Sequence, residues 1–111
     1  MDAQQFAQKL STALQWNPVP VAPDSGETPD DYTVIETGGL VKIVWTRSFS
    51  IFGRFIVQRA SFSVQEQSGI WTVADGIQTT KAEYRMWFPA IARESRPGDE
   101  FDPQSLLQFY Q

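Results

Sequence analysis

Residues 41–60 read VKIVWTRSFSIFGRFIVQRA, and they indicate two extended segments joined by a turn. Apolar and polar side chains largely alternate from Val41 to Phe49, which is typical of a strand with one buried face. Gly53 marks the bend, and a second apolar-rich segment follows it. The stretch therefore predicts two consecutive antiparallel strands.

The same stretch reverses the sign of the charge. The chain of 111 residues has a formal net charge of -4, yet these residues hold four cations and no acid. The cations are Lys42, Arg47, Arg54 and Arg59, and they are interleaved with the rings of Trp45, Phe49, Phe52 and Phe55. Two interpretations are open: the acidic flanks neutralise this segment within one molecule, or the segment presents a positive field to a partner.

On the N-terminal side, the spacing of apolar residues predicts a helix over residues 2–15. These side chains recur three and four residues apart and form one stripe, and Asp2 can cap the first turn. Residues 17–31 then predict a proline-rich acidic linker, because proline removes amide donors and disfavours a helix before it.

On the C-terminal side, residues 32–88 predict an antiparallel sheet of four or five strands. The candidate strands are 32–37, 40–49, 54–67, 70–74 and the alternating segment AEYRMWF at 82–88, with a hairpin turn at Asp75-Gly76. Apolar residues change parity within 54–67, from Phe55 and Val57 to Phe62 and Val64. We therefore expect a bulge near Arg59–Ser61.

The remaining residues, 89–111, predict a loop and a short helix. Asp102 followed by Pro103 is typical of a helix start, with an N-cap and a proline in the first turn. The expected fold is α+β: an N-terminal helix packed on a four- or five-stranded antiparallel meander, with a short C-terminal helix, in a single domain over 1–111.

Composition removes most routes to catalysis. The chain has no cysteine and no histidine, so thiol chemistry, disulfides, thiolate zinc sites and the commonest general base are excluded. We expect no enzyme, no cofactor and no metal site, because nucleotide-binding and calcium-loop motifs are missing as well. A carboxylate pair acting as acid and base stays open, and its candidates are Glu66, Asp75, Glu83 and Glu94.

The N-terminal sequence and the short apolar runs predict a cytoplasmic protein that makes no membrane contact. The N-terminus MDAQQFAQKL lacks the basic and apolar regions of a signal peptide. No apolar run approaches the roughly 18 residues that a membrane-spanning helix needs.

The basic-aromatic segment is the candidate binding site. Arginine and aromatic side chains are enriched in the cores of protein interfaces. We also expect Trp87 to be exposed, since it falls on the polar side of the predicted 82–88 strand. The predicted partner-binding residues are Arg47, Phe49, Phe52, Arg54, Phe55, Arg59 and Trp87.

The expected function is a non-enzymatic protein-interaction module, such as an accessory or assembly subunit, an inhibitor or a small structural protein. Its partner is another protein or a second copy of the chain. An alternative is a single-stranded nucleic-acid-binding protein that uses the same rings and cations, although the sequence pI of about 4.6 opposes it. A third possibility is a curled sheet that binds a small ligand, or a carboxylate-only enzyme.

Overall fold

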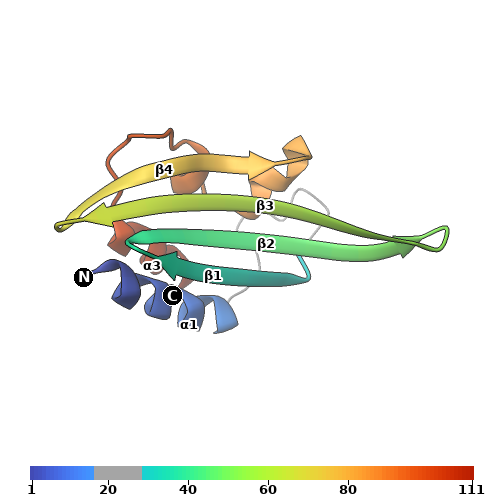
Figure 1. Ribbon diagram of the computed structural model, residues 1–111, viewed down its shortest axis with the longest axis horizontal. Helices are drawn as coiled ribbons and strands as arrows, with labels where there is room; N and C mark the ends of the chain where they lie inside the picture. The colour runs from blue at the N-terminus through green and yellow to red at the C-terminus, as the bar shows by residue number, and fades with distance from the viewer. Residues whose placement is uncertain (17–28) are drawn as a thin grey trace.

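Four antiparallel strands form one open sheet in the computed structural model, which describes residues 1–16 and 29–111 (Figure 1). The sheet order follows the chain as β1 (Asp31–Thr37), β2 (Leu40–Ile51), β3 (Arg54–Gln67) and β4 (Ile70–Thr79). The helical elements are α1 (Ala3–Trp16), the 3-10 helix η2 (Ala82–Trp87), α2 (Ala90–Arg93) and α3 (Pro103–Tyr110). The α+β fold with N- and C-terminal helices is confirmed. Most of the predicted 17–31 linker lies outside the described residues.

Both predicted helix starts are confirmed by their caps. The Gln5 backbone N–H donates to the Asp2 carboxylate at 2.8 Å, and the Asp2 N–H donates to the Gln5 side chain at 3.0 Å. This reciprocal pair satisfies two amides that a helix start leaves without partners. At α3, the Asp102 carboxylate accepts from the Gln104 N–H at 3.1 Å, with proline next in the chain.

The core lies on one face of the sheet, under the helices. Alternate residues of the central strands point into it and are buried: Val41, Ile43 and Trp45 from β2, and Ala60, Phe62 and Val64 from β3. The apolar stripe of α1 packs here too, with the Phe6 ring 5.1 Å from the Trp71 ring. Since the other sheet face holds polar or partly exposed side chains, the fold buries one face only.

The hairpin predicted at Asp75-Gly76 is wrong, because β4 runs through both residues. Asp75 pairs with Ser63 across the sheet, and its carboxylate accepts from the Ser63 hydroxyl at 3.2 Å. A side chain at Gly76 would place its Cβ 3.1 Å from the Ser95 carbonyl oxygen. Glycine therefore makes room here for the loop after α2, and it does not mark a turn.

The strand predicted at 82–88 is also wrong, and the sheet has four strands. Residues Ala82–Trp87 form η2, in which side chains three apart lie on the same side. The rings of Tyr84 and Trp87 accordingly stack with centroids 4.2 Å apart, and both are buried. The alternation of AEYRMWF therefore does not reflect a strand.

The irregularity expected in β3 begins at the end of the predicted stretch. The register with β4 shifts between Ser61 and Ser63 and again between Ser63 and Val64. The parity change has a different cause, because even-numbered residues of β3 face the core side along the strand. Phe55 and Val57 lie on the opposite, open face, so no rotation of the strand is needed.

The turn between β1 and β2 provides a test of this packing. Gly39 has φ +90°, and a Cβ there would lie 2.5 Å from the Glu66 carbonyl oxygen, whereas a Cβ on Gly38 (φ +58°) meets nothing within 4 Å. We expect Gly38→Ala to lower the free energy of unfolding by about 1 kcal/mol. Gly39→Ala should lower it by about 3 kcal/mol, because it adds a backbone clash. Equal losses in urea unfolding would contradict the described contact.

Candidate functional site

The β2–β3 hairpin continues beyond the rest of the sheet. The pairing of β1 with β2 reaches Thr46, and that of β4 with β3 reaches Ala60. Among the described residues, 47–59 therefore form a two-stranded ribbon, which we call the β2–β3 arm. Figure 1 shows it projecting past the helices, and the molecule measures 49 × 27 × 26 Å.

An aromatic ring occupies a strained position at the tip of the arm. Phe52 and Gly53 form the two-residue turn, with φ of +51° and +75°. The other two hairpins also turn through two residues with positive φ, but they use Gly38-Gly39 and Ser68-Gly69. Such turns favour glycine, asparagine and aspartate, and a bulky residue with positive φ is an outlier.

The Phe52 side chain is 96% exposed, so its burial within the fold does not compensate for this strain. Strained backbone of this kind gathers at sites of function rather than at sites of folding. The tip therefore presents a ring that the folded chain itself does not use.

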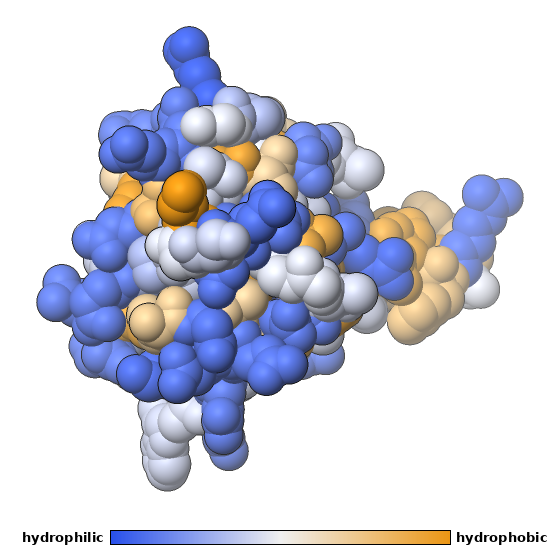
Figure 2. All heavy atoms as spheres, turned by 60° about the vertical axis from the view of Figure 1, so that its left-hand side comes forward, coloured by the Kyte–Doolittle hydropathy of each residue, from blue (hydrophilic) through white to orange (hydrophobic). Residues whose placement is uncertain are grey.

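The arm carries apolar groups on both of its faces. On the open side, Phe55 is 74% exposed and Val57 40% exposed. On the core side, Phe49 lies directly across from Ile56, and both are partly buried. Figure 2 shows hydrophobic side chains gathered on this projecting end. These exposed apolar side chains make the arm a candidate interaction site.

Contacts at its root hold the arm in place. The Ser48 backbone N–H donates to the Asp30 carboxylate at 2.8 Å, and the Tyr84 hydroxyl donates to the Gln58 side-chain oxygen. The Arg47 guanidinium lies 5.4 Å from the centre of the Phe49 ring. The first two contacts join the arm to the residue before β1 and to η2, and the third lies within the arm, so the fold restrains the direction of the arm.

The arm is basic, whereas the rest of the chain is acidic. Residues 47–59 hold three arginines and no acid, which gives +3. Since the whole chain has a formal charge of -4, the remaining residues carry -7. The arm therefore favours contact with a negatively charged surface.

Six of the seven predicted site residues come together in the arm. Phe52, Arg54, Phe55 and Arg59 are exposed, and Arg47 and Phe49 are partly buried. The seventh was wrongly placed on a surface: Trp87 is 0% exposed, because η2 turns its ring into the core. It cannot anchor a partner in this conformation.

Ile51 and Val57 are not among the predicted site residues, although both are partly exposed on the arm. The change of apolar parity along β3 was the signal for Val57. When apolar residues lie on both faces of one strand, the face outside the core is a candidate for contact with a partner.

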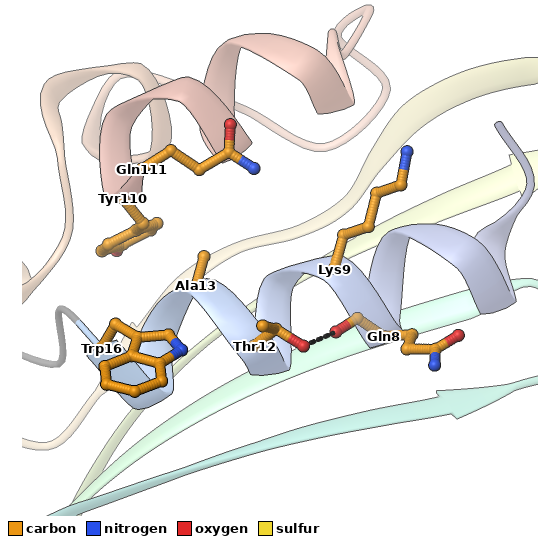
Figure 3. A pocket seen from close by; sticks show the side chains of 7 residues that line it. All are labelled: Gln8, Lys9, Thr12, Ala13, Trp16, Tyr110 and Gln111. Atoms are coloured by element: carbon orange, nitrogen blue, oxygen red, sulfur yellow. Dashed lines mark hydrogen bonds between the residues drawn. The ribbon is translucent and has the colours of Figure 1, made fainter.

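One surface hollow lies beside the arm, and another lies on the helical side of the fold. One, of about 360 Å³, lies on the open sheet face beside the arm, and its lining is Thr33, Ile35, Lys42, Val44, Thr46, Arg59 and Ser61. The other, of about 480 Å³, lies between α1 and α3 (Figure 3). It is lined by Gln8, Lys9, Thr12, Ala13, Trp16, Tyr110 and Gln111.

The polar groups of the groove between α1 and α3 include the hydroxyls of Tyr110 and Thr12 and the amine of Lys9. Burial raises the pKa of the Tyr110 hydroxyl, which keeps it protonated. The Thr12 hydroxyl donates to the Gln8 carbonyl at 3.1 Å (Figure 3). Lys9 is the single charged side chain in the lining, where polar side chains surround the apolar groups of Ala13, Trp16 and Tyr110.

Two further features concern metals and membranes. Within residues 1–16 and 29–111, no group of three or more acidic side chains is placed to hold a metal ion. In the same ranges, the helices are too short or too polar to span a bilayer.

Replacing the tip residue tests whether its conformation is strained. We expect Phe52→Asn to raise the free energy of unfolding by about 1 kcal/mol, because asparagine tolerates positive φ and the lost ring is 96% exposed. The matched control is Ser68→Asn, at the same position of the β3–β4 turn, where the change should be smaller. A loss of stability in Phe52→Asn, measured by urea unfolding, would show that the ring supports the fold.

Comparisons of the chain with protein-family models, with curated proteins and with solved structures find no match in any of the three. Its function is therefore inferred from the geometry of its own residues. In that geometry, the β2–β3 arm is the candidate site.

Proposed function

We propose that this protein is a non-enzymatic interaction module, which docks a protein partner through the β2–β3 arm. The observation that carries the proposal is the fully exposed ring of Phe52, held at positive φ at the end of an extended hairpin. An accessory or assembly subunit, an inhibitor or a small structural protein would work in this way. A cytoplasmic location remains part of the proposal.

The side chains of the tip suit a protein interface. Two exposed rings, Phe52 and Phe55, flank Arg54. Aromatic and arginine side chains dominate the binding free energy of interfaces, since they bury large areas and the guanidinium can pair with acids. Full burial of one phenylalanine side chain contributes roughly 1.5–3 kcal/mol. Two such rings are enough to anchor a specific contact.

The fixed root of the arm supports the same proposal. Binding to a preformed ribbon costs less conformational entropy than binding that must first order a loop. The bonds from Ser48 to Asp30 and from Tyr84 to Gln58 hold the two strands of the arm at its base. They leave the tip open while restraining the direction in which it points.

A single-stranded nucleic acid suits the arm less well. The ring of Trp45, which would extend a stacking platform along the sheet, is buried in the core. Stacking would then be restricted to the tip, where Phe52 and Phe55 are the exposed rings. Steep loss of capture with rising salt, together with sensitivity to nuclease, would identify this alternative.

The proposal is tested by purifying the tagged chain from its native source and quantifying what accompanies it. We expect a defined protein to be retained by the natural chain and depleted about tenfold by Phe52→Ala with Phe55→Ala, because both anchors are lost. The matched control is Ile70→Ala, which removes an apolar side chain that is 67% exposed at another turn. Full retention by the double variant, or equal loss in the control, would overturn the proposal.

A further inference from the structure

We infer that the partner adds a strand to the outer edge of β3 in the arm, along Phe55–Arg59, and that this strand is an extended acidic segment. The inference rests on the proposed function and specifies both the mode of contact and the chemistry of the partner. It follows from the direction of the backbone groups, from the cover of the two edges and from the charge of the arm.

Asp30 reveals which backbone groups of the arm point outward. Its N–H donates to the Thr46 carbonyl at 2.9 Å, and its carboxylate accepts from the Ser48 N–H at 2.8 Å. The even-numbered residues of β2 thus turn their backbone groups away from β3. In an antiparallel ladder, residues opposite such positions also turn theirs outward, to the other edge.

The residues opposite are identified by the register. Arg59 lies across from Thr46, Val57 from Ser48, and Phe55 from Ser50. The N–H and C=O groups of Phe55, Val57 and Arg59 therefore line the outer edge of β3. Their side chains share the open face of the sheet, and all three residues are exposed.

The two edges of the arm are covered differently. Asp30 closes the β2 edge at the root, as described above. On the β3 edge, pairing with β4 stops at Ala60 opposite Thr79, and the chain then turns into η2. Of the described residues, none pairs by a strand ladder with Phe55–Arg59 on that side. An open strand edge is a template on which an extended segment can pair.

The positive charge of the arm indicates which kind of partner segment fits this edge. Arg54 and Arg59 lie at the two ends of this edge, and the arm holds no acid. Opposite charges on neighbouring strands stabilise their pairing, and like charges directly opposite weaken it. A second arm from another copy would bring six arginines together without an acid. The edge therefore favours a foreign segment with a carboxylate near each end, opposite Arg54 and Arg59, and apolar side chains between them.

The experiment selects peptides from a random displayed library on the full chain, then measures the affinity of each enriched peptide as a synthetic, end-blocked probe. We expect enriched sequences in which acids lie near both ends of a short apolar stretch. We expect Val57→Pro to weaken their binding about tenfold, because it removes one outward N–H without removing a bond between β2 and β3. Val57→Thr keeps that N–H and should change the affinity by no more than about twofold.

A second pair of variants tests the charge. Arg54→Glu with Arg59→Glu should weaken binding about tenfold and flatten its dependence on salt. Lys9→Glu with Arg96→Glu makes the same change in net charge away from the arm, so it should leave binding within about twofold. If Val57→Pro unfolds the chain in circular dichroism, a synthetic chain with N-methylated Val57 replaces it.

The outcomes separate this inference from the proposed function. Peptides that bind independently of Val57 and the two arginines, basic peptides, or the lack of any enriched peptide would overturn the strand addition. Loss of the native partner in Phe52→Ala with Phe55→Ala, but not in Val57→Pro, would also overturn it and would leave the arm as a docking site. Failure of both sets of variants to affect the native partner would overturn the proposed function itself.

Discussion

The pairing of Trp45 with Ala60 sets the boundary on which the rest of this structure depends. Trp45 is the last fully buried residue along β2, and its ring lies 6.2 Å from Phe88 and 6.5 Å from Tyr110. These two rings come from the C-terminal part of the chain, and they pack against the sheet at this point. Beyond it the two strands continue as the arm, where the Tyr84 hydroxyl of η2 still reaches the Gln58 side chain.

This boundary explains why the arm has two apolar faces. An isolated hairpin is only marginally stable in water, so a ribbon that leaves the core needs support. Here the support comes from the long register with the buried half of β2 and β3 and from the contacts of Asp30 and Tyr84 at the root. The body thus stabilises the arm, and the exposed side chains of the arm remain available for another molecule.

Much of this fold follows from local sequence patterns. The helix starts were predictable because Asp2 and Asp102 precede apolar stripes, and the central strands because apolar residues alternate from Val41 to Phe49 and a second apolar-rich segment follows Gly53. The failures came where tertiary contacts override a local signal. Gly76 resembles a turn residue, but it is small because the Ser95 carbonyl oxygen lies against it. The segment around Tyr84 alternates like a strand, but the stacking of Tyr84 on Trp87 belongs to a 3-10 helix.

The candidate site was predictable in composition but not in shape. The rings and cations around Gly53 identified the segment, since no acid interrupts them. Nothing in the sequence shows that β1 and β4 stop short of this segment, because strand length is set by pairing across the whole sheet. The same limit explains Trp87, whose exposure was inferred from a strand that does not form.

Residue-resolved amide hydrogen exchange of the free protein tests the central claim most directly. If the arm is a formed hairpin with an open outer edge, the amides of Ile56 and Gln58 exchange slowly and those of Phe55, Val57 and Arg59 exchange fast. Uniformly fast exchange across 54–59 would show that the hairpin is not formed. Uniformly slow exchange would show that its outer edge is already covered, and either result would contradict this account.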